Sequence, residues 1–202
     1  VHARYEVTDE TAVPVLTDLL MHGDAHLISF MDHTPGQGQF KSVEAYRNYL
    51  GKTYKKSDEE FDAILQQKLK AAQGATARME ALASVAKAHG VSIASHDDDS
   101  PAKVDIVHSL GAVISEFPIN LETAQAAKAK GLATLFGAPN ILRGKSQSGS
   151  MRALDAVINK VADCLCGDYS PAALLPAALA LPALAGISIS EAVALVTLNP
   201  AR

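Results

Sequence analysis

The chain has 202 residues, of which 48% are hydrophobic and 20% are charged, and its formal net charge is −4. This composition is typical of a folded α/β protein and excludes a disordered chain. This weakly negative net charge gives no excess of positive charge that would attract a polyanion. Neither nucleic acid nor a membrane surface is therefore expected as a partner.

The cysteines and the most apolar segment bear on the compartment. Cys164 and Cys166 are separated by one residue, and neighbours this close seldom form a disulfide, so we expect a reducing, cytoplasmic environment. Residues 1–7 lack the apolar run of a signal peptide, and none is expected. Residues 171–187 are uncharged but contain prolines and fall short of the roughly 20 residues of a membrane span. A buried helix is the favoured interpretation, with a membrane span as the alternative.

Short apolar segments that favour strands alternate with segments of helical periodicity along the chain. The predicted strands are Val1–Val7, His26–Met31, Val91–Ser95, Ala112–Phe117, Leu132–Phe136 and Asp163–Gly167. The predicted helices are Thr11–Met21, Val43–Leu50, Asp58–Ala72, Thr76–Ala88, Lys103–Ser109, Leu121–Lys130, Met151–Ala162 and Ala172–Ile187. Ser57 and Glu60 have the spacing of a capping box, and Gly23, Gly90 and Gly131 are placed to end helices.

This alternation implies parallel strands joined by right-handed helical connections. An open, doubly wound sheet that binds a dinucleotide would carry a glycine fingerprint after its first strand, and the sequence has none. A complete (β/α)8 barrel needs eight strands and about 250 residues. We therefore predict an α/β fold in which residues 1–202 form one partial domain, an incomplete (β/α)8 TIM-type barrel with about six parallel strands.

Polar residues stand at the carboxyl ends of four predicted strands, where a fully buried parallel strand would stay apolar. They are His33, His96, Glu116 and Asp168. In barrels the carboxyl ends of the strands form the catalytic face, where side chains from different strands meet. A site is therefore expected at this end of the sheet.

The first predicted strand and the run after His96 add further polar groups. Alternation places His2, Arg4 and Glu6 on one face of the first strand, where a polar barrel interior would receive them. The alternative is an edge strand with one solvent-exposed face. Asp97 fits a carboxylate that orients His96. Asp98, Asp99 and Ser100 fit a helix N-cap before Pro101 better than a ligand set.

Imidazole and carboxylate groups suit a divalent ion such as zinc, with manganese and iron as alternatives. The predicted metal ligands are Glu6, His33, His96 and Asp168. Two ions bridged by a carboxylate would lower the pKa of a shared water towards neutrality. Asp168 is the predicted catalytic residue that accepts the proton of this water. A single histidine would favour a structural role, whereas four such residues together favour a site.

Residues 137–149 follow the fifth predicted strand and are rich in glycine, hydroxyl groups and positive charge. A loop of this kind can bind phosphate through backbone N–H groups and cationic side chains. The spacing does not match a P-loop, and a flexible surface loop explains the pattern equally well.

Five motifs resemble a known family. They are Met31–Gln37, Ala94–Asp98, Glu116–Pro118, Gly137–Asn140 and Gly167–Tyr169. In this order, over nearly the whole chain, they resemble the PhnM family of amidohydrolase-superfamily diphosphatases in the carbon–phosphorus lyase pathway. The Met-Asp-His-x-Pro-Gly-Gln and Ala-Ser-His-Asp-Asp elements are the specific ones. The resemblance implies hydrolysis of α-D-ribose 1-methylphosphonate 5-triphosphate with release of diphosphate.

The resemblance also implies residue roles. Glu6 resembles the carboxylate that bridges two metal ions, and His33 and His96 resemble strand-end ligands. Asp168 resembles the metal-bound acid and base. Arg143 stands in the family's Asn-x-x-Arg-Gly segment, where it would contact the triphosphate. The predicted substrate-binding residues are Asn140, Arg143, Lys145, Ser148 and Glu116.

The sequence departs from the family pattern in ways that affect these roles. The superfamily's first-strand His-x-His or His-x-Asp pair is absent, as is the small β-sandwich of complete members. Because that pair supplies ligands, we expect this chain to hold metal weakly or not at all. Lys145 and Gln147 stand where the family is expected to have Gly and His.

Two other functions stay open. Another amidohydrolase would cleave a C–N bond in a cyclic amide or an N-acetyl sugar phosphate, and the cationic segment favours a phosphorylated substrate without identifying the bond. The alternative of a different class is a catalytically inert, truncated chain. The expected partner is a phosphorylated small-molecule substrate. The sheet edges of an incomplete barrel also predict a homo-oligomer.

Overall fold

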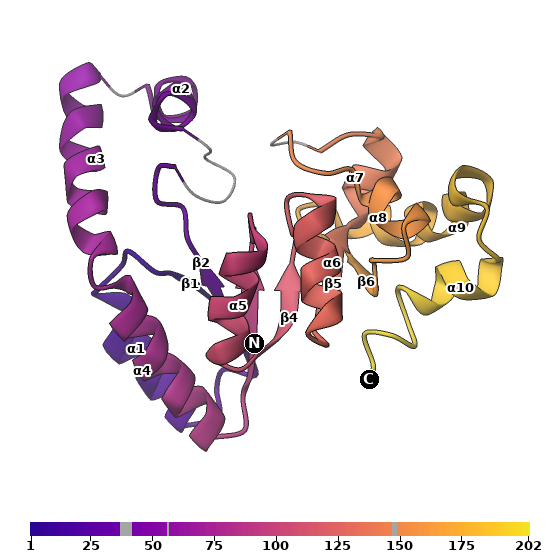
Figure 1. The fold of residues 1–202 in the computed structure, drawn as a ribbon, viewed down its shortest axis with the longest axis horizontal. Helices are drawn as coiled ribbons and strands as arrows, with labels where there is room; N and C mark the ends of the chain where they lie inside the picture. The colour runs from indigo at the N-terminus through magenta and orange to yellow at the C-terminus, as the bar shows by residue number, and fades with distance from the viewer. Residues whose placement is uncertain (37–41, 56, 147–148) are drawn as a thin grey trace. The chain divides into compact units, whose positions relative to one another are not determined.

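The computed structural model describes residues 1–36, 42–55, 57–146 and 149–202 (Figure 1). Six parallel strands alternate with helices, which is an α/β fold consistent with a partial TIM-type barrel. The chain divides into two compact units. The first comprises Val1–His96 with Ser109–Ala112, and the second comprises Asp97–His108 with Val113–Arg202.

The first unit contains three parallel strands. Strand β1 (His2–Glu6) pairs with β2 (Leu27–Met31), and β2 pairs with β3 (Ser92–His96). Its helices are α1 (Ala12–Met21), α2 (Val43–Tyr54), α3 (Asp58–Ala72) and α4 (Ala75–Ala88). Helices α1 and α4 pack against each other (Figure 1), while α2 and α3 are additional helices in the connection between β2 and α4.

Strand β1 has the two faces that its sequence predicts. Ala3 and Tyr5 are buried, whereas His2 and Arg4 are exposed and Glu6 is half-buried. The apolar side of the strand therefore packs into the core, and the polar side carries the groups available for chemistry.

The register brings polar positions of the three strands onto one face. Arg4 is the partner of Ser29, Glu6 is the partner of Met31, and Met31 is in turn the partner of His96. Partner positions on parallel strands point to the same side of a sheet. Arg4, Glu6 and His96 therefore project from the same face.

The second unit also contains three parallel strands, β4 (Ala112–Glu116), β5 (Ala133–Gly137) and β6 (Cys164–Cys166), with β5 paired to both neighbours. Its helices are α5 (Pro101–Ser109), α6 (Leu121–Ala129), α7 (Ala138–Arg143), α8 (Ala153–Ile158), the short 3-10 helix η1 (Pro171–Ala173), α9 (Leu174–Ala185) and α10 (Ile189–Ala194). The apolar sides of the helices from α6 to α10 share one core with β5 and β6, in which Ile141, Leu165 and Leu181 are buried.

Most of the predicted elements are confirmed. Each end of every strand lies within one residue of its predicted position. The capping box is also confirmed, because the Glu60 N–H donates to Oγ of Ser57 at 3.3 Å and the Ser57 N–H donates to Glu60 at 2.9 Å. Gly23, Gly90 and Gly131 all have positive φ, as expected for residues that end helices.

Two helices correct the prediction. Residues 137–149 were predicted as a loop, but α7 occupies Ala138–Arg143 and ends at Gly144, which has φ 69°. Ile141 of this helix is buried in the unit's core, and this packing favours helix over loop. Helix α10 is absent from the prediction, although Ser188 and Glu191 form a capping box at its start.

Within the residues that the structure describes, no helix has the length and apolar character needed to cross a bilayer.

The cysteines behave as predicted. Both Cys164 and Cys166 are free. Burial raises the pKa of the Cys166 thiol to about 11, so this group stays protonated near neutral pH. A half-buried, protonated thiol fits a packing role for Cys166 better than a reactive one.

Candidate metal and phosphate site

Glu6, at the end of β1, binds His33, which follows β2. Nδ1 of His33 donates to Oε2 of Glu6 at 2.7 Å, and the His33 backbone N–H donates to Oε1 at 3.3 Å. The Thr8 hydroxyl also donates to Oε1, at 3.1 Å. An ionised carboxylate only accepts hydrogen bonds, so Nδ1 carries the proton and Nε2 is left as the basic nitrogen of His33.

The surroundings of Glu6 keep its carboxylate ionised. Burial by itself raises the pKa of Glu6, but the hydrogen bond from His33 and the positive charge of Lys68 act in the opposite direction. The net result is a pKa below the usual value. Nζ of Lys68, from α3, lies 3.6 Å from Oε1 of Glu6. A charged Glu6 is thus available near neutral pH to orient His33.

His96, the last residue of β3, is held by a cation. Nη2 of Arg4 donates to Nε2 of His96 at 2.7 Å, and since guanidinium has no acceptor, Nε2 carries the lone pair. The rings of His33 and His96 have centroids 6.4 Å apart and planes at 80°. The first unit therefore brings together three of the predicted ligands, Glu6, His33 and His96.

A candidate ligand set lies at these strand ends. In the described part of the chain, one possible ligand atom each of His33, His96 and Asp97 lies within 4.8 Å of those of the other two. Asp97 follows β3 directly and has φ 55°, a conformation that aspartate tolerates better than most residues. Two imidazoles and a carboxylate are a donor set that zinc accepts. From the sequence, Asp97 was expected to orient His96. The structure makes it an additional candidate ligand, because its carboxylate lies near both imidazoles.

The prediction for the residues after Asp97 is partly wrong. Ser100 does cap α5, because its Oγ accepts a hydrogen bond from the Lys103 N–H at 3.3 Å. Asp98, however, is fully buried and accepts a hydrogen bond from Oγ of Ser115 at 2.5 Å. Asp98 is therefore a buried residue bonded to β4, and this burial differs from the exposed helix cap that the sequence predicted.

The second unit contains the predicted catalytic residue. Asp168 follows β6 with φ 48°, and its Oδ2 would lie 3.4 Å from a Cβ added to Gly137, the last residue of β5. The ring of Phe117 would lie 3.6 Å from the same added atom. Phe117, which directly follows β4, has φ 56°, unusual for a bulky residue. Strained residues at strand ends often accompany functional sites.

Glu116 lies at the end of β4, in the same unit as Asp168. Its side chain is buried, with only 4% of the residue exposed. The charges of Asp168 and Glu116 both raise the pKa of the Cys166 thiol. The two carboxylates are therefore close enough to Cys166 to act on it. The role of Glu116 in substrate binding stays a prediction.

Arg143, at the end of α7, contacts the residue that follows Asp168. Its Nη1 donates to the Tyr169 hydroxyl oxygen, and its Nε donates to the Lys145 carbonyl oxygen at 3.1 Å. The guanidinium carbon lies 5.9 Å from the centroid of the Tyr169 ring. The segment predicted to bind phosphate is thus attached to the turn that carries Asp168.

The other predicted substrate-binding residues are placed as follows. The amide of Asn140 holds the chain after α7, since Nδ2 donates to the Met151 carbonyl at 3.4 Å and Oδ1 accepts from the Ala153 N–H at 3.0 Å. Lys145 is exposed, and Ser148 lies outside the described residues. Substrate contact by these residues stays a prediction.

We predict that the turn carrying Asp168 depends on Gly167. A Cβ at this position would lie 2.8 Å from Cα of Pro171, which is backbone and cannot rotate away. Gly167→Ala should therefore lower the free energy of unfolding by about 1–3 kcal/mol. Gly137→Ala is the matched control, because its Cβ would meet its nearest neighbour at an ordinary 3.4 Å. Urea denaturation measures both variants, and equal stability of the two would contradict the prediction.

Parallel strands joined by helices, with imidazole and carboxylate groups at the strand ends, define an α/β protein of the partial TIM-barrel class. No family model matches the sequence. In an alignment of 204 residues that covers the whole chain, the sequence is 38% identical to the alpha-D-ribose 1-methylphosphonate 5-triphosphate diphosphatase of Escherichia coli (strain K12). The chain spans about half the length of this curated relative, 54%. The similarity is consistent with a fragment of a protein of this kind.

Proposed function

We propose that the chain acts, as part of a metal-dependent hydrolase of phosphonate metabolism, on α-D-ribose 1-methylphosphonate 5-triphosphate and releases diphosphate. The observation that carries this proposal is the 38% identity to the diphosphatase over the whole chain. The pairing of Glu6 with His33, and the closeness of His33, His96 and Asp97, support a metal-dependent reaction.

The donor set fits a divalent ion, and zinc is the proposed one, with manganese or iron as alternatives. His33, His96 and Asp97 would hold it, and Glu6 would orient His33 through Nδ1. When bound, such an ion lowers the pKa of a water molecule and offsets charge on phosphoryl oxygens. The family resemblance implies instead that Glu6 is itself a bridging metal ligand. Both roles would use the same carboxylate oxygens, which contact His33 in the structure.

Asp168 and Arg143 supply the remaining chemistry in this proposal. The Asp168 carboxylate accepts a proton from the attacking water as the new phosphorus–oxygen bond forms. Arg143 would bind the departing diphosphate oxygens as negative charge develops on them. The contact between Arg143 and Tyr169 supports this role, because it holds the guanidinium beside the residue after Asp168.

An assay of diphosphate release tests this proposal. The chain, supplied with zinc or manganese, should release diphosphate from the ribosyl methylphosphonate triphosphate and leave the 5-phosphate. Release of an amine or acetate from a cyclic amide or an N-acetyl sugar phosphate, without diphosphate, would instead support the C–N hydrolase. Absence of turnover with every metal and substrate would support an inert chain.

We also propose that the protein works in the cytoplasm and self-associates. In the first unit β1 is the outer strand of the set of three, and outer strands can pair between copies. Leu175 and Leu179 of α9 are 62% and 55% exposed and one helical turn apart, so they present an apolar patch. Sedimentation at micromolar concentration should show a dimer or larger species, and a monomer at every concentration would contradict self-association.

A further inference from the structure

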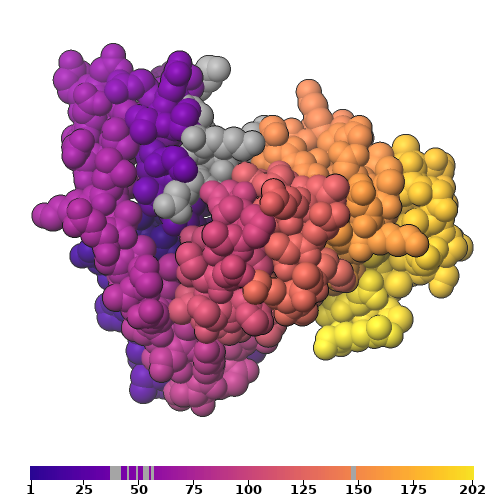
Figure 2. Space-filling view, viewed as in Figure 1, coloured from indigo at the N-terminus to yellow at the C-terminus, as the bar shows by residue number. Residues whose placement is uncertain are grey.

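Helices α2 and α3, between β2 and α4, have a small core of their own. Tyr46, Leu50 and Phe61 are buried together, and Ile64 and Leu65 pack at the edge. The rings of Tyr46 and Phe61 have centroids 6.0 Å apart. We call α2 and α3 together the helical hairpin. It lies at the surface of its unit (Figure 2).

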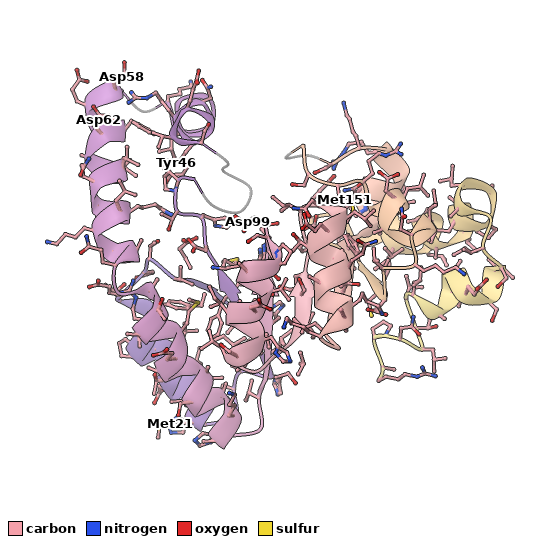
Figure 3. All side chains as sticks on the ribbon, viewed as in Figure 1. Met21, Tyr46, Asp58, Asp62, Asp99 and Met151 are labelled. Carbon is pink, nitrogen blue, oxygen red and sulfur yellow. The ribbon has the colours of Figure 1, made fainter. Side chains whose placement is uncertain are left out.

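Arg47 links the two helices of the hairpin. Its guanidinium donates to Asp58 at 2.5 Å and to Asp62 at 2.9 Å, and its central carbon lies 4.0 Å from the centroid of the Phe61 ring. Asp58 and Asp62 lie on α3, at the end near α2 (Figure 3). These contacts hold α2 against α3.

Arg78, on α4, fixes the other end of the hairpin to β1. Its Nη2 and Nε donate to the Val7 carbonyl oxygen at 2.8 and 3.1 Å, and Nη2 also donates to the Ala71 carbonyl in the last turn of α3. The Arg78 side chain is only 13% exposed. Since Val7 follows Glu6, this buried contact ties the end of α3 to the strand end that carries the site.

Lys68 is the hairpin residue that reaches the site. It lies one helical turn before Ala71, and its Nζ is 3.6 Å from Oε1 of Glu6 and 5.8 Å from the centroid of the Tyr46 ring. The Lys68 side chain is 24% exposed, so a small ligand can approach it. The hairpin thus delivers a positive charge to the carboxylate that holds His33.

The contact with Glu6 leaves Lys68 able to bind a ligand. Glu6 already accepts hydrogen bonds from the Thr8 hydroxyl and from two groups of His33. The Lys68 ammonium, at 3.6 Å, is beyond hydrogen-bond distance from it. Glu6 therefore attracts the ammonium electrostatically without engaging its N–H groups. An ammonium has three donors and suits phosphoryl oxygens as a point charge.

We propose that Lys68 binds a phosphoryl oxygen of the substrate and makes the helical hairpin a specificity element of the site. This inference rests on the proposed function, because it takes the substrate to be a phosphoric anhydride. The hairpin then selects substrates with an anionic chain beside Glu6 and His33, and Lys68 does so without being a metal ligand.

Calorimetric titration with inorganic pyrophosphate tests this inference, with every variant in the same buffer without added metal, because pyrophosphate binds free zinc. Lys68→Gln should raise the Kd for pyrophosphate about tenfold, the loss expected for one charge-assisted hydrogen bond. Lys68→Arg should retain most of the affinity, because it keeps the charge. Lys70→Gln is the matched control: Lys70 lies on the same helix and is exposed, so its removal changes net charge equally and should leave Kd unchanged.

Three results would overturn the inference: no pyrophosphate binding by the unaltered chain, equal binding by the unaltered chain and Lys68→Gln, or equal weakening by Lys70→Gln. If Lys68→Gln unfolds at a lower temperature, Lys68→Met keeps the apolar stem near Tyr46 and replaces it in the titration. Turnover of the triphosphate separates the two proposals. Lys68-dependent binding without turnover would refute the proposed function alone, whereas turnover with an unchanged KM in Lys68→Gln would refute the role of Lys68.

Discussion

Asp168→Asn should lower kcat for the proposed triphosphate substrate by about 10² to 10⁴-fold, the usual contribution of a positioned acid or base, and should retain the fold. Asparagine has nearly the same shape as aspartate but does not accept the proton of the attacking water. Asparagine also tolerates the left-handed conformation that Asp168 adopts, with φ 48°. The loss of rate should therefore report chemistry and not backbone strain.

Steady-state assays of diphosphate release measure this effect, and circular dichroism checks the fold. Asp155→Asn is a suitable control, since Asp155 pairs with Arg152 at the surface of α8 and should be dispensable for turnover. Activity of Asp168→Asn within a few-fold of the unaltered chain would remove Asp168 from the mechanism. A loss that is equal in both variants would point to a general effect of charge.

The strands and the main ligand candidates could be predicted because their signals are local. Alternation of polar and apolar residues predicts β1, and short apolar segments predict β2 and β3, so that polar residues at the ends of these strands stand out. Glu6, His33 and His96 are found in this way, and the structure places all three together in the first unit. Helix α7 also has local signals, with Pro139 in its first turn and Gly144 at its end, but the glycine and hydroxyl groups after it favoured a loop.

Other parts of the site depend on contacts between residues far apart in the sequence. Lys68 meets Glu6 across 62 positions, where Arg78 also connects the end of α3 to the residue after β1. No periodicity of α3 distinguishes Lys68 from other surface lysines. The different positions of Asp97 and Asp98 also could not be predicted from the sequence. The two are neighbours of one type, yet the turn after β3 directs Asp97 to the imidazoles and Asp98 into the core.

Zinc binding should respond in a graded way to substitutions at the candidate metal site. His33→Ala should weaken zinc binding by roughly a hundredfold or more, because one of the candidate ligands is lost. Glu6→Gln should weaken it by about 10 to 100-fold, the range for a group that orients a ligand. The amide of glutamine is neutral and holds the Nδ1–H group of His33 less strongly than the carboxylate does.

Competition with a zinc-sensitive dye gives these affinities without any activity assay. His22→Ala is the control, since His22 lies at the exposed end of α1 and its ring contacts the Asp18 carbonyl oxygen at 2.9 Å. If Glu6→Gln abolishes binding as completely as His33→Ala does, Glu6 is itself a ligand and the bridging role implied by the family resemblance holds. If His22→Ala has the same effect as His33→Ala, the zinc is bound elsewhere and the strand-end site is wrong. The intermediate result is the expected one, because in the structure Glu6 already directs both its oxygens to His33.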